Sequence, residues 1–187
     1  MAKRQKHTAK YLNPDELERL FRAITDTRDR AIFRLAYHRG LRAREVGRIQ
    51  LADWRPQAGR LFVRRLKGSV SAEHRLTEAE ERALRSWMRV RGKAAGPLFP
   101  GYKGRGVGRA QMHVLMREYC AAAGIPLEKA HFHSLKHSCA VELLARGEGV
   151  IDVQDHLGHT DIRSTMVYAK LRNAGREQRA ERLTDWR

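Results

Sequence analysis

Apolar residues near the start of the chain recur every three to four positions, which is the spacing of one helix face. Asn13 followed by Glu16 is typical of a capped helix start, with Pro14 at the first helical position. A second helix is predicted through residues 29–39, and Gly40 ends it. The residues predicted to face inward are Leu17, Leu20, Phe21, Ile24, Ile32, Leu35 and Ala36.

Residues 59–76, GRLFVRRLKGSVSAEHRL, change from helical spacing to alternation, with Leu61 and Val63 on one side. This alternation predicts a strand, a turn and a second strand, and it places Lys67 near the turn. A short helix is expected over residues 43–50, before the hairpin. The apolar pattern thus predicts a small antiparallel sheet within a mostly helical chain.

The second half of the chain returns to helical spacing. Thr77 followed by Glu80 predicts the capped start of a helix that runs to about Arg91. Residues 94–110 are rich in glycine and are expected to form a connector, since they lack the Gly-Lys-Ser/Thr ending of a triphosphate-binding loop. Further helices are predicted over residues 110–124, 131–144, 150–158, 161–170 and 171–187. The pattern predicts an α+β domain that is mostly α-helical.

Charge and composition narrow the expected partners. The 187 residues include 38 Lys and Arg against 21 Asp and Glu, a net charge of +17. A protein this basic usually binds a polyanion, so nucleic acid is expected, with a solvated basic surface as the alternative. Cys120 and Cys139 are too few for a disulfide framework, which favours reduced thiols and a cytoplasmic protein. The N-terminus lacks the apolar core of a signal peptide, and no membrane span is expected.

Residues 131–144, HFHSLKHSCAVELL, place three histidines and a lysine ahead of an apolar stretch. His133 and His137 lie four positions apart, a spacing at which two imidazoles on a helix can bind a metal ion. No nearby Asp or Glu completes a metalloprotease-like pattern. A metal site is therefore the weaker alternative, and no metal or cofactor is expected.

Six residues with chemistry suited to phosphodiester cleavage follow one another along the chain. A tyrosine hydroxyl can attack phosphorus and form a phosphotyrosine bond that conserves the energy for religation. Fixed cations and hydrogen-bond donors stabilise the charge that develops on the phosphate oxygens, and a proton donor assists the departing sugar oxygen. The six candidate catalytic residues are Arg42, Lys67, His133, Lys136, His159 and Tyr168.

The segments around these residues resemble the tyrosine recombinases, the phage integrase family. GLRAREV at 40–46 resembles the family's first box, and LKGSVSAEHRL at 66–76 resembles its hairpin segment with a lysine. HSLKH at 133–137 resembles the His-x-x-Arg box. HLGHTDIRSTMVYAK at 156–170 resembles the closing Leu-Gly-His and tyrosine segment. The resemblance extends from about residue 12 to residue 170.

The resemblance implies a role for each candidate. Tyr168 would be the nucleophile that forms a 3′-phosphotyrosine, and Arg42 would bind the phosphate. Lys67 would donate a proton to the departing 5′ oxygen. His133 and His159 would position the phosphate or exchange protons with the phosphate and the phenol. The implied activity is site-specific cleavage and rejoining of DNA strands.

Lys136 stands where the family pattern has arginine, so a single ammonium replaces a flat, two-pronged donor. One alternative is therefore a noncatalytic or weakly catalytic DNA-binding protein on the same fold, and another is a type IB topoisomerase. The resemblance implies a catalytic domain over residues 12–187 after a basic tail at 1–11. Such a chain is either a fragment or a short form like the fimbrial-switch recombinases. The expected partners are double-stranded DNA and further copies of the chain, as a tetramer on DNA, with no membrane and no small-molecule substrate.

Overall fold

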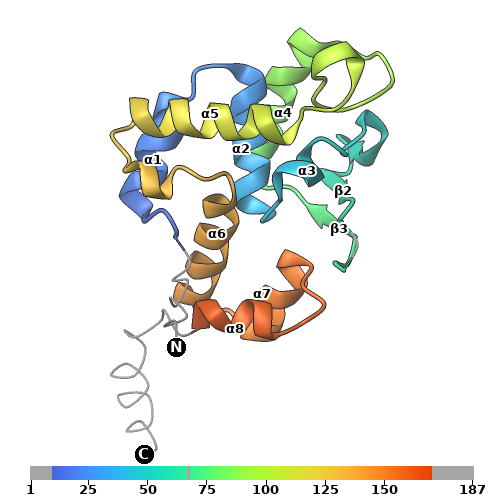
Figure 1. The fold of residues 1–187 in the computed structure, drawn as a ribbon. Coiled ribbons are helices and arrows are strands. Elements are labelled where there is room, and N and C mark those ends of the chain that lie inside the picture. The colour runs from blue at the N-terminus through green and yellow to red at the C-terminus, as the bar shows by residue number, and fades with distance from the viewer. Residues whose placement is uncertain (1–9, 67, 170–187) are drawn as a thin grey trace, which may run out of the picture.

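The computed structural model describes residues 10–66 and 68–169, and it confirms a mostly helical domain with a small antiparallel sheet (Figure 1). The predicted last helix over residues 171–187 and most of the predicted basic tail lie outside the described residues. In chain order the elements are α1 (Pro14–Ala23), α2 (Thr27–His38), α3 (Ala43–Val46), β1 (Trp54–Arg55), β2 (Arg60–Val63), β3 (Ala72–Arg75), α4 (Glu78–Arg91), α5 (Arg109–Ala122), α6 (His133–Ala145), α7 (Val150–Leu157) and α8 (Arg163–Ala169), with short 3-10 turns at Leu51–Asp53, Tyr102–Gly104 and Leu127–Lys129.

Local side chains set the helix ends, as the sequence predicts. At the start of α1, Asn13 Oδ1 accepts a hydrogen bond from the Glu16 amide, and the Glu16 carboxylate accepts one from the Asn13 amide, both at 2.8 Å. Thr77 and Glu80 form the same reciprocal pair at the start of α4. Helix α7 ends at Gly158, whose φ of 65° is a left-handed conformation that glycine adopts without a steric penalty.

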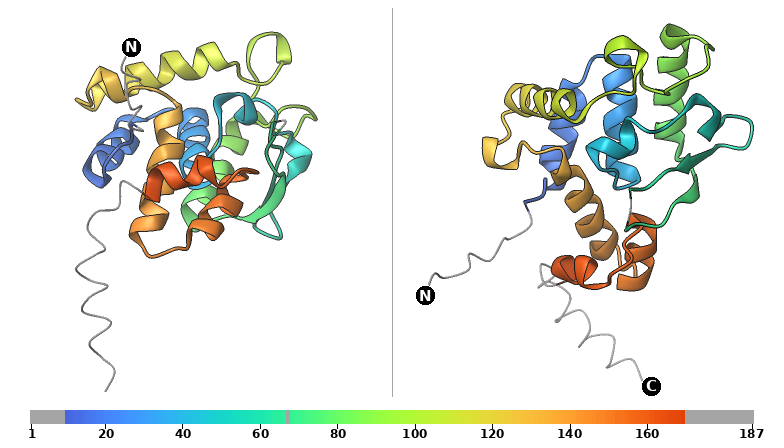
Figure 2. Two further views of the ribbon diagram at one scale, coloured as in Figure 1. Left: turned by 60° about the horizontal axis from the view of Figure 1, so that its bottom comes forward. Right: turned by 45° about the vertical axis from the view of Figure 1, so that its right-hand side comes forward.

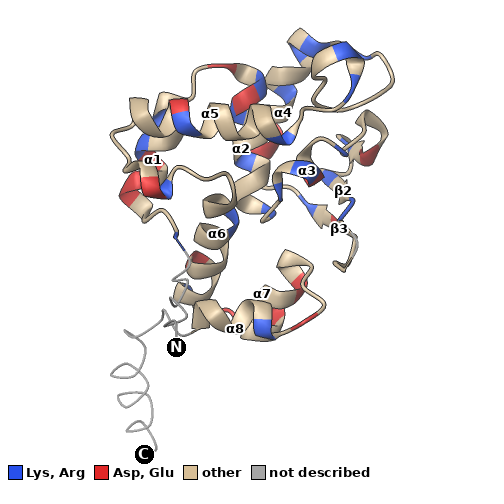
Figure 3. Ribbon diagram, viewed as in Figure 1, with Lys and Arg blue, Asp and Glu red and all other residues tan. Residues whose placement is uncertain are grey.

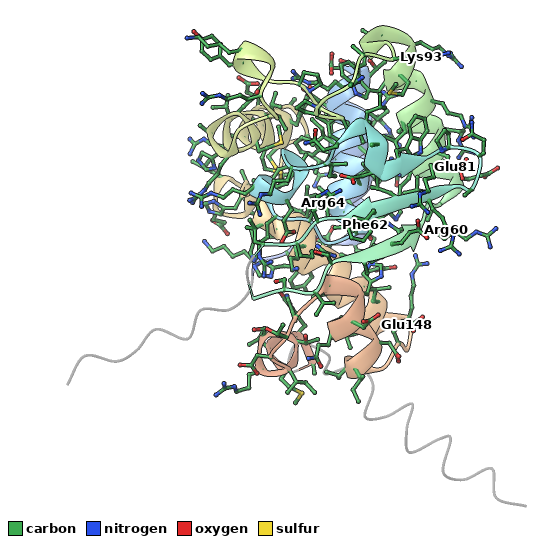
Figure 4. The ribbon with its side chains drawn as sticks, turned by 90° about the vertical axis from the view of Figure 1, so that its right-hand side faces the viewer. Arg60, Phe62, Arg64, Glu81, Lys93 and Glu148 are labelled. Carbon is green, nitrogen blue, oxygen red and sulfur yellow. The ribbon has the colours of Figure 1, made fainter. Side chains whose placement is uncertain are left out.

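The strands in the described ranges form an antiparallel sheet in the order β1–β2–β3. Strand β2 has the predicted alternation, since Leu61 and Val63 are buried in the core. Arg60, Phe62 and Arg64 follow the same strand on its more exposed side (Figure 4). The sequence did not reveal β1, because a strand of two residues is too short to show alternation.

Helix α2 forms the centre of the domain and packs against both α4 and α6 (Figures 1 and 2). Its residues Ile32, Phe33 and Leu35 are fully buried in the main hydrophobic core, to which α1, α5 and β2 also contribute. A second, smaller core lies between α6, α7 and α8. Its members are Cys139, Ala140, Leu144, Val153, Leu157 and Tyr168. Helices α7 and α8 therefore pack on α6 through a core of their own, which includes the predicted nucleophile.

One segment differs from the prediction, and a second is a loop as predicted but contributes to the core. The helix expected over residues 43–50 is only the single turn α3. After this turn the chain passes against the backbone of a distant loop, so closely that a Cβ at Gly47 would lie 2.3 Å from the Val107 carbonyl oxygen. The expected connector at 94–110 belongs to that loop, and its Phe99 is fully buried. The glycine-rich segment is therefore the predicted connector, and its Leu98, Phe99 and Val107 also contribute to the core.

The described residues also bear on the expected thiol state and on membrane association. Cys120 and Cys139 are buried and carry free thiols. Burial raises the pKa of Cys120 to about 11 and that of Cys139 to about 12, so both thiols stay protonated near neutral pH. No helix in the described part of the chain is long and apolar enough to cross a membrane. The cytoplasmic location stays a prediction.

Candidate active site

Arg42 stands directly before α3, at its N-cap position. Its Nη1 donates to Glu45 Oε1 at 2.8 Å and to Ser69 Oγ at 2.9 Å, and the side chain is 33% exposed. The Glu45 carboxylate also accepts from the Arg42 amide at 2.8 Å. The Arg42 guanidinium is therefore held by the Glu45 carboxylate and by Ser69, which lies between β2 and β3. Part of the side chain stays open to solvent.

Glu45 is itself held by a second arginine. Arg65 is buried, and its Nη1 lies 3.2 Å from Glu45 Oε2. Burial alone raises the pKa of Glu45, but the hydrogen bonds from Arg42 and the charge of Arg65 outweigh it and lower that pKa. Arg65 also donates to the carbonyl oxygens of Arg39 at 2.7 Å and of His156 at 3.0 Å. The prediction missed Arg65, although it continues the inward side of the strand alternation.

His159 lies in the turn between α7 and α8, and this turn pairs with the segment between β2 and β3. His159 forms an isolated β-bridge with Ser69, the residue that accepts from Arg42. The Val70 amide donates to the Gly158 carbonyl oxygen at 3.1 Å. The His159 side chain is buried, and its Nδ1 lies 3.0 Å from Thr165 Oγ1. Burial, followed by the charges of Lys136 and Arg42, lowers the pKa of His159 to about 4.

The sixth predicted residue, Lys67, lies outside the described residues. Its neighbour Gly68 is described, and the Gly68 carbonyl oxygen accepts from Thr160 Oγ1 at 2.9 Å. The segment that follows Lys67, from Gly68 to the start of β3, therefore lies against the turn that contains His159.

Helix α6 places its two predicted site residues, His133 and Lys136, in different surroundings. His133 is exposed at the helix start, whereas Lys136 is fully buried and its Nζ donates to the Leu157 carbonyl oxygen at 2.8 Å. Burial, followed by the charges of Arg65 and Arg42, lowers the pKa of Lys136 to about 7. In this structure Lys136 secures the end of α7, and only His133 faces solvent.

His137, which the sequence suggested with His133 as a candidate metal ligand, contacts the predicted nucleophile. Its Nδ1 lies 2.7 Å from the Tyr168 hydroxyl, and its ring centroid lies 4.4 Å from that of His133. Burial, followed by the charges of His133 and Lys136, lowers the pKa of His137 to about 4. Burial also raises the pKa of Tyr168 to about 12, and that side chain is only 3% exposed. The phenol is a neutral, enclosed group in this arrangement.

A cleft of about 560 Å³ opens beside Arg42 and His133. The surrounding atoms and the charges of Lys136 and Arg42 lower the pKa of His133 to about 4, although the side chain is exposed. Basic positions lie on α3 and β2, while α7 carries acidic ones (Figure 3). The other residues lining the cleft are Ala43, Arg44, Leu66, Arg109, His113, His131 and Phe132. Three arginines, Arg42, Arg44 and Arg109, make this cleft a basic groove.

Two other features of the described residues could in principle form a site. A cleft of about 570 Å³ between α1, α2 and α6 is lined by none of the six predicted residues. Across residues 10–66 and 68–169, no three His, Cys, Asp or Glu side chains are grouped so as to hold a metal ion. Of the two histidines that suggested a metal site, His137 has its Nδ1 against the Tyr168 hydroxyl. The basic groove is therefore the best candidate.

Comparison with known proteins decides the family. The sequence profile of the Phage integrase family matches residues 10–174. The chain belongs to the phage integrase family. Among integrase relatives, the type 1 fimbriae regulatory protein FimE of Escherichia coli K12 is 32% identical over 168 residues, covering 85% of this chain and 84% of FimE. The tyrosine recombinase XerC of Chromohalobacter salexigens is 30% identical, covering 89% of this chain and 57% of XerC.

Solved structures of integrases have the same fold. The XerA recombinase is 26% identical with a TM-score of 0.81, covering 97% of this chain and 66% of XerA. The catalytic domain of bacteriophage HP1 integrase is 18% identical with a TM-score of 0.67, covering 92% of this chain and 93% of that domain. The predicted family, fold and class of enzyme, a tyrosine-type site-specific DNA recombinase, are thus confirmed. The individual site residues and domain bounds stay predictions.

Proposed function

We propose that this integrase cleaves and rejoins double-stranded DNA at specific sites, with Tyr168 forming a covalent bond to the 3′ phosphate. The observation that supports this most strongly is the convergence of residues far apart in sequence. Ser69 links Arg42 to His159, and His137 links helix α6 to Tyr168. A basic groove opens at Arg42 and His133. Phosphate and nucleophile would therefore meet at this place.

The proposed reaction is an in-line displacement at phosphorus. The Tyr168 oxygen attacks, the bond to the 5′ oxygen breaks, and Lys67 gives that oxygen a proton. Arg42 donates to the nonbridging oxygens, and its position is supported by Glu45. His133 and His159 donate hydrogen bonds to the same phosphate or exchange protons with it. Each fixed donor of this kind contributes roughly a hundredfold to a thousandfold in rate.

In this proposal Lys136 takes the place of the family arginine once its Nζ leaves the Leu157 carbonyl oxygen, to which it donates in this structure. Its charge is felt at both histidines, since it lowers the pKa of His133 and of His159. We expect Lys136→Ala to impair cleavage strongly and Lys136→Arg to retain or raise it, because the arginine keeps the charge and adds a second donor. Single-turnover phosphotyrosine formation measures both. Cleavage by Lys136→Ala at the parental rate would remove Lys136 from the phosphate site.

Double-stranded DNA is the proposed partner. Solved complexes show the XerH recombinase bound to its difH substrate before and after cleavage. The charge of +17 and the basic groove of this chain suit the same kind of ligand. The proposal includes assembly as a tetramer on DNA and requires no cofactor and no small-molecule substrate.

Covalent trapping on a nicked suicide substrate tests the proposal. The parent should form a phosphotyrosine adduct that persists in excess EDTA. Tyr168→Phe should bind DNA without forming the adduct, and the matched control Tyr119→Phe should form it normally. An adduct at parental yield in Tyr168→Phe would overturn the assignment. Binding by the parent with no adduct would favour the noncatalytic alternative, and loss in EDTA that one divalent ion restores would favour a metal site.

A further inference from the structure

The predicted nucleophile is enclosed in a position where it cannot attack DNA. Tyr168 is 3% exposed and belongs to the small core between α6, α7 and α8. Apolar neighbours in this core include Ala140, Leu144 and Val153. A phosphodiester on a duplex cannot enter such a space, so the phenol must leave this position before it reaches phosphorus.

One polar contact at 2.7 Å joins the phenol to helix α6 inside this apolar setting, from the Tyr168 hydroxyl to His137 Nδ1. A buried hydroxyl without a partner is strongly disfavoured, so this contact favours the enclosed position over others. The His137 ring is neutral near pH 7, since its pKa is lowered to about 4. A neutral imidazole offers one bare nitrogen, which suits it to accept the phenolic hydrogen.

We propose that His137 is a positioning residue that holds the Tyr168 phenol in an enclosed resting position, and that release of this contact precedes strand cleavage. The inference rests on the proposed role of Tyr168 as nucleophile. In the resting state the phenol donates to His137 Nδ1. On release the hydroxyl leaves with its proton, so no bond other than the hydrogen bond changes in this step.

Three variants at position 137 separate hydrogen bonding from packing. His137→Asn places an amide oxygen near the position of Nδ1, so the phenol keeps a partner. His137→Leu fills part of the same space without an acceptor, and His137→Gln carries its amide near the position of Nε2. Only the asparagine variant should behave as the parent does.

Acetylation by N-acetylimidazole, followed by peptide mass spectrometry, measures access to each tyrosine without DNA. Tyr168 should be modified about fivefold faster in His137→Leu than in the parent, the population change expected on loss of one hydrogen bond of ordinary net strength. Tyr102 is 82% exposed and serves as the reagent control. Tyr119, whose hydroxyl donates to Asp29 at 2.8 Å, reports unfolding, because its modification should change only if the whole domain opens.

Single-turnover cleavage of a nicked substrate then follows the same variants. If release precedes cleavage, His137→Leu should cleave several-fold faster than the parent, and His137→Asn should match the parent. Unchanged Tyr168 acetylation in His137→Leu would overturn the proposal, and so would faster acetylation with slower cleavage, which would place His137 in the chemistry itself. Acetylation does not depend on which residue is the nucleophile. A failure of the proposed function would instead appear as an adduct in Tyr168→Phe.

Discussion

The buried ammonium of Lys136 should make the stability of the protein depend on pH between about 7 and 10.5. The side chain is fully buried, and its pKa is lowered from 10.5 to about 7. Between these values the unfolded chain binds more protons at this position than the folded one. Raising the pH therefore stabilises the fold, and this stability is lost as the pH falls through the folded pKa. A difference of 3.5 pKa units corresponds to at most on the order of 5 kcal/mol.

Lys136→Met tests this dependence, because it fills a similar volume with an uncharged side chain. Urea unfolding at pH 7, 8, 9 and 10 gives the free energy of unfolding of both proteins. The parent should gain stability relative to the variant over this range. The variant also loses the hydrogen bond to the Leu157 carbonyl oxygen, a constant cost of about 1–3 kcal/mol at every pH. Burial raises the pKa of Cys139 to about 12, so this thiol lowers stability as the pH rises, but it does so in both proteins and cancels in their difference. Parallel curves for parent and variant would refute the reasoning.

Three further predictions concern the scaffold and the DNA interface. Gly158→Ala should lower the free energy of unfolding by about 2 kcal/mol or more, because the residue has a φ of 65° and a Cβ would lie 2.8 Å from the Val70 carbonyl oxygen. Gly104 has a φ of 72° but open space around it, so Gly104→Ala should lower the free energy of unfolding only by the cost of the left-handed backbone conformation. Equal losses of stability in the two variants, measured by urea unfolding, would contradict the steric argument. Glu45→Gln should cost about 3–5 kcal/mol, because Arg65 is left buried without its counter-ion, and a melting temperature equal to the parent's would exclude this. Nonspecific DNA affinity should fall steeply between 50 and 200 mM salt, at roughly one counterion per phosphate contact, and a flat dependence in fluorescence anisotropy would argue against a basic DNA-binding groove.

Much of the fold could be predicted because its signals are local. The Asn13–Glu16 and Thr77–Glu80 pairs act within one helical turn, so the sequence alone shows where α1 and α4 begin. Gly158 likewise shows from its own position in the sequence where α7 ends. Packing over long sequence distances could not be predicted in this way. Nothing near Gly47 in the sequence indicates that the Val107 backbone lies against it, so the length of α3 was wrong.

The same distinction explains the site. The order of motifs predicted Arg42, His159 and Tyr168 as site residues, but the direction in which a side chain points depends on its partners in space. Lys136 points inward because the carbonyl at the end of α7 lies within 2.8 Å, a contact across 21 positions of sequence. His137 meets Tyr168 because α8 crosses α6. A motif can therefore predict which residues take part in chemistry, whereas the resting geometry, with the nucleophile enclosed and the lysine buried, follows from how α7 and α8 pack on α6. Under the proposed role of Tyr168 this packing must change before cleavage, so we expect the stability of the small core to set how readily the active arrangement is reached.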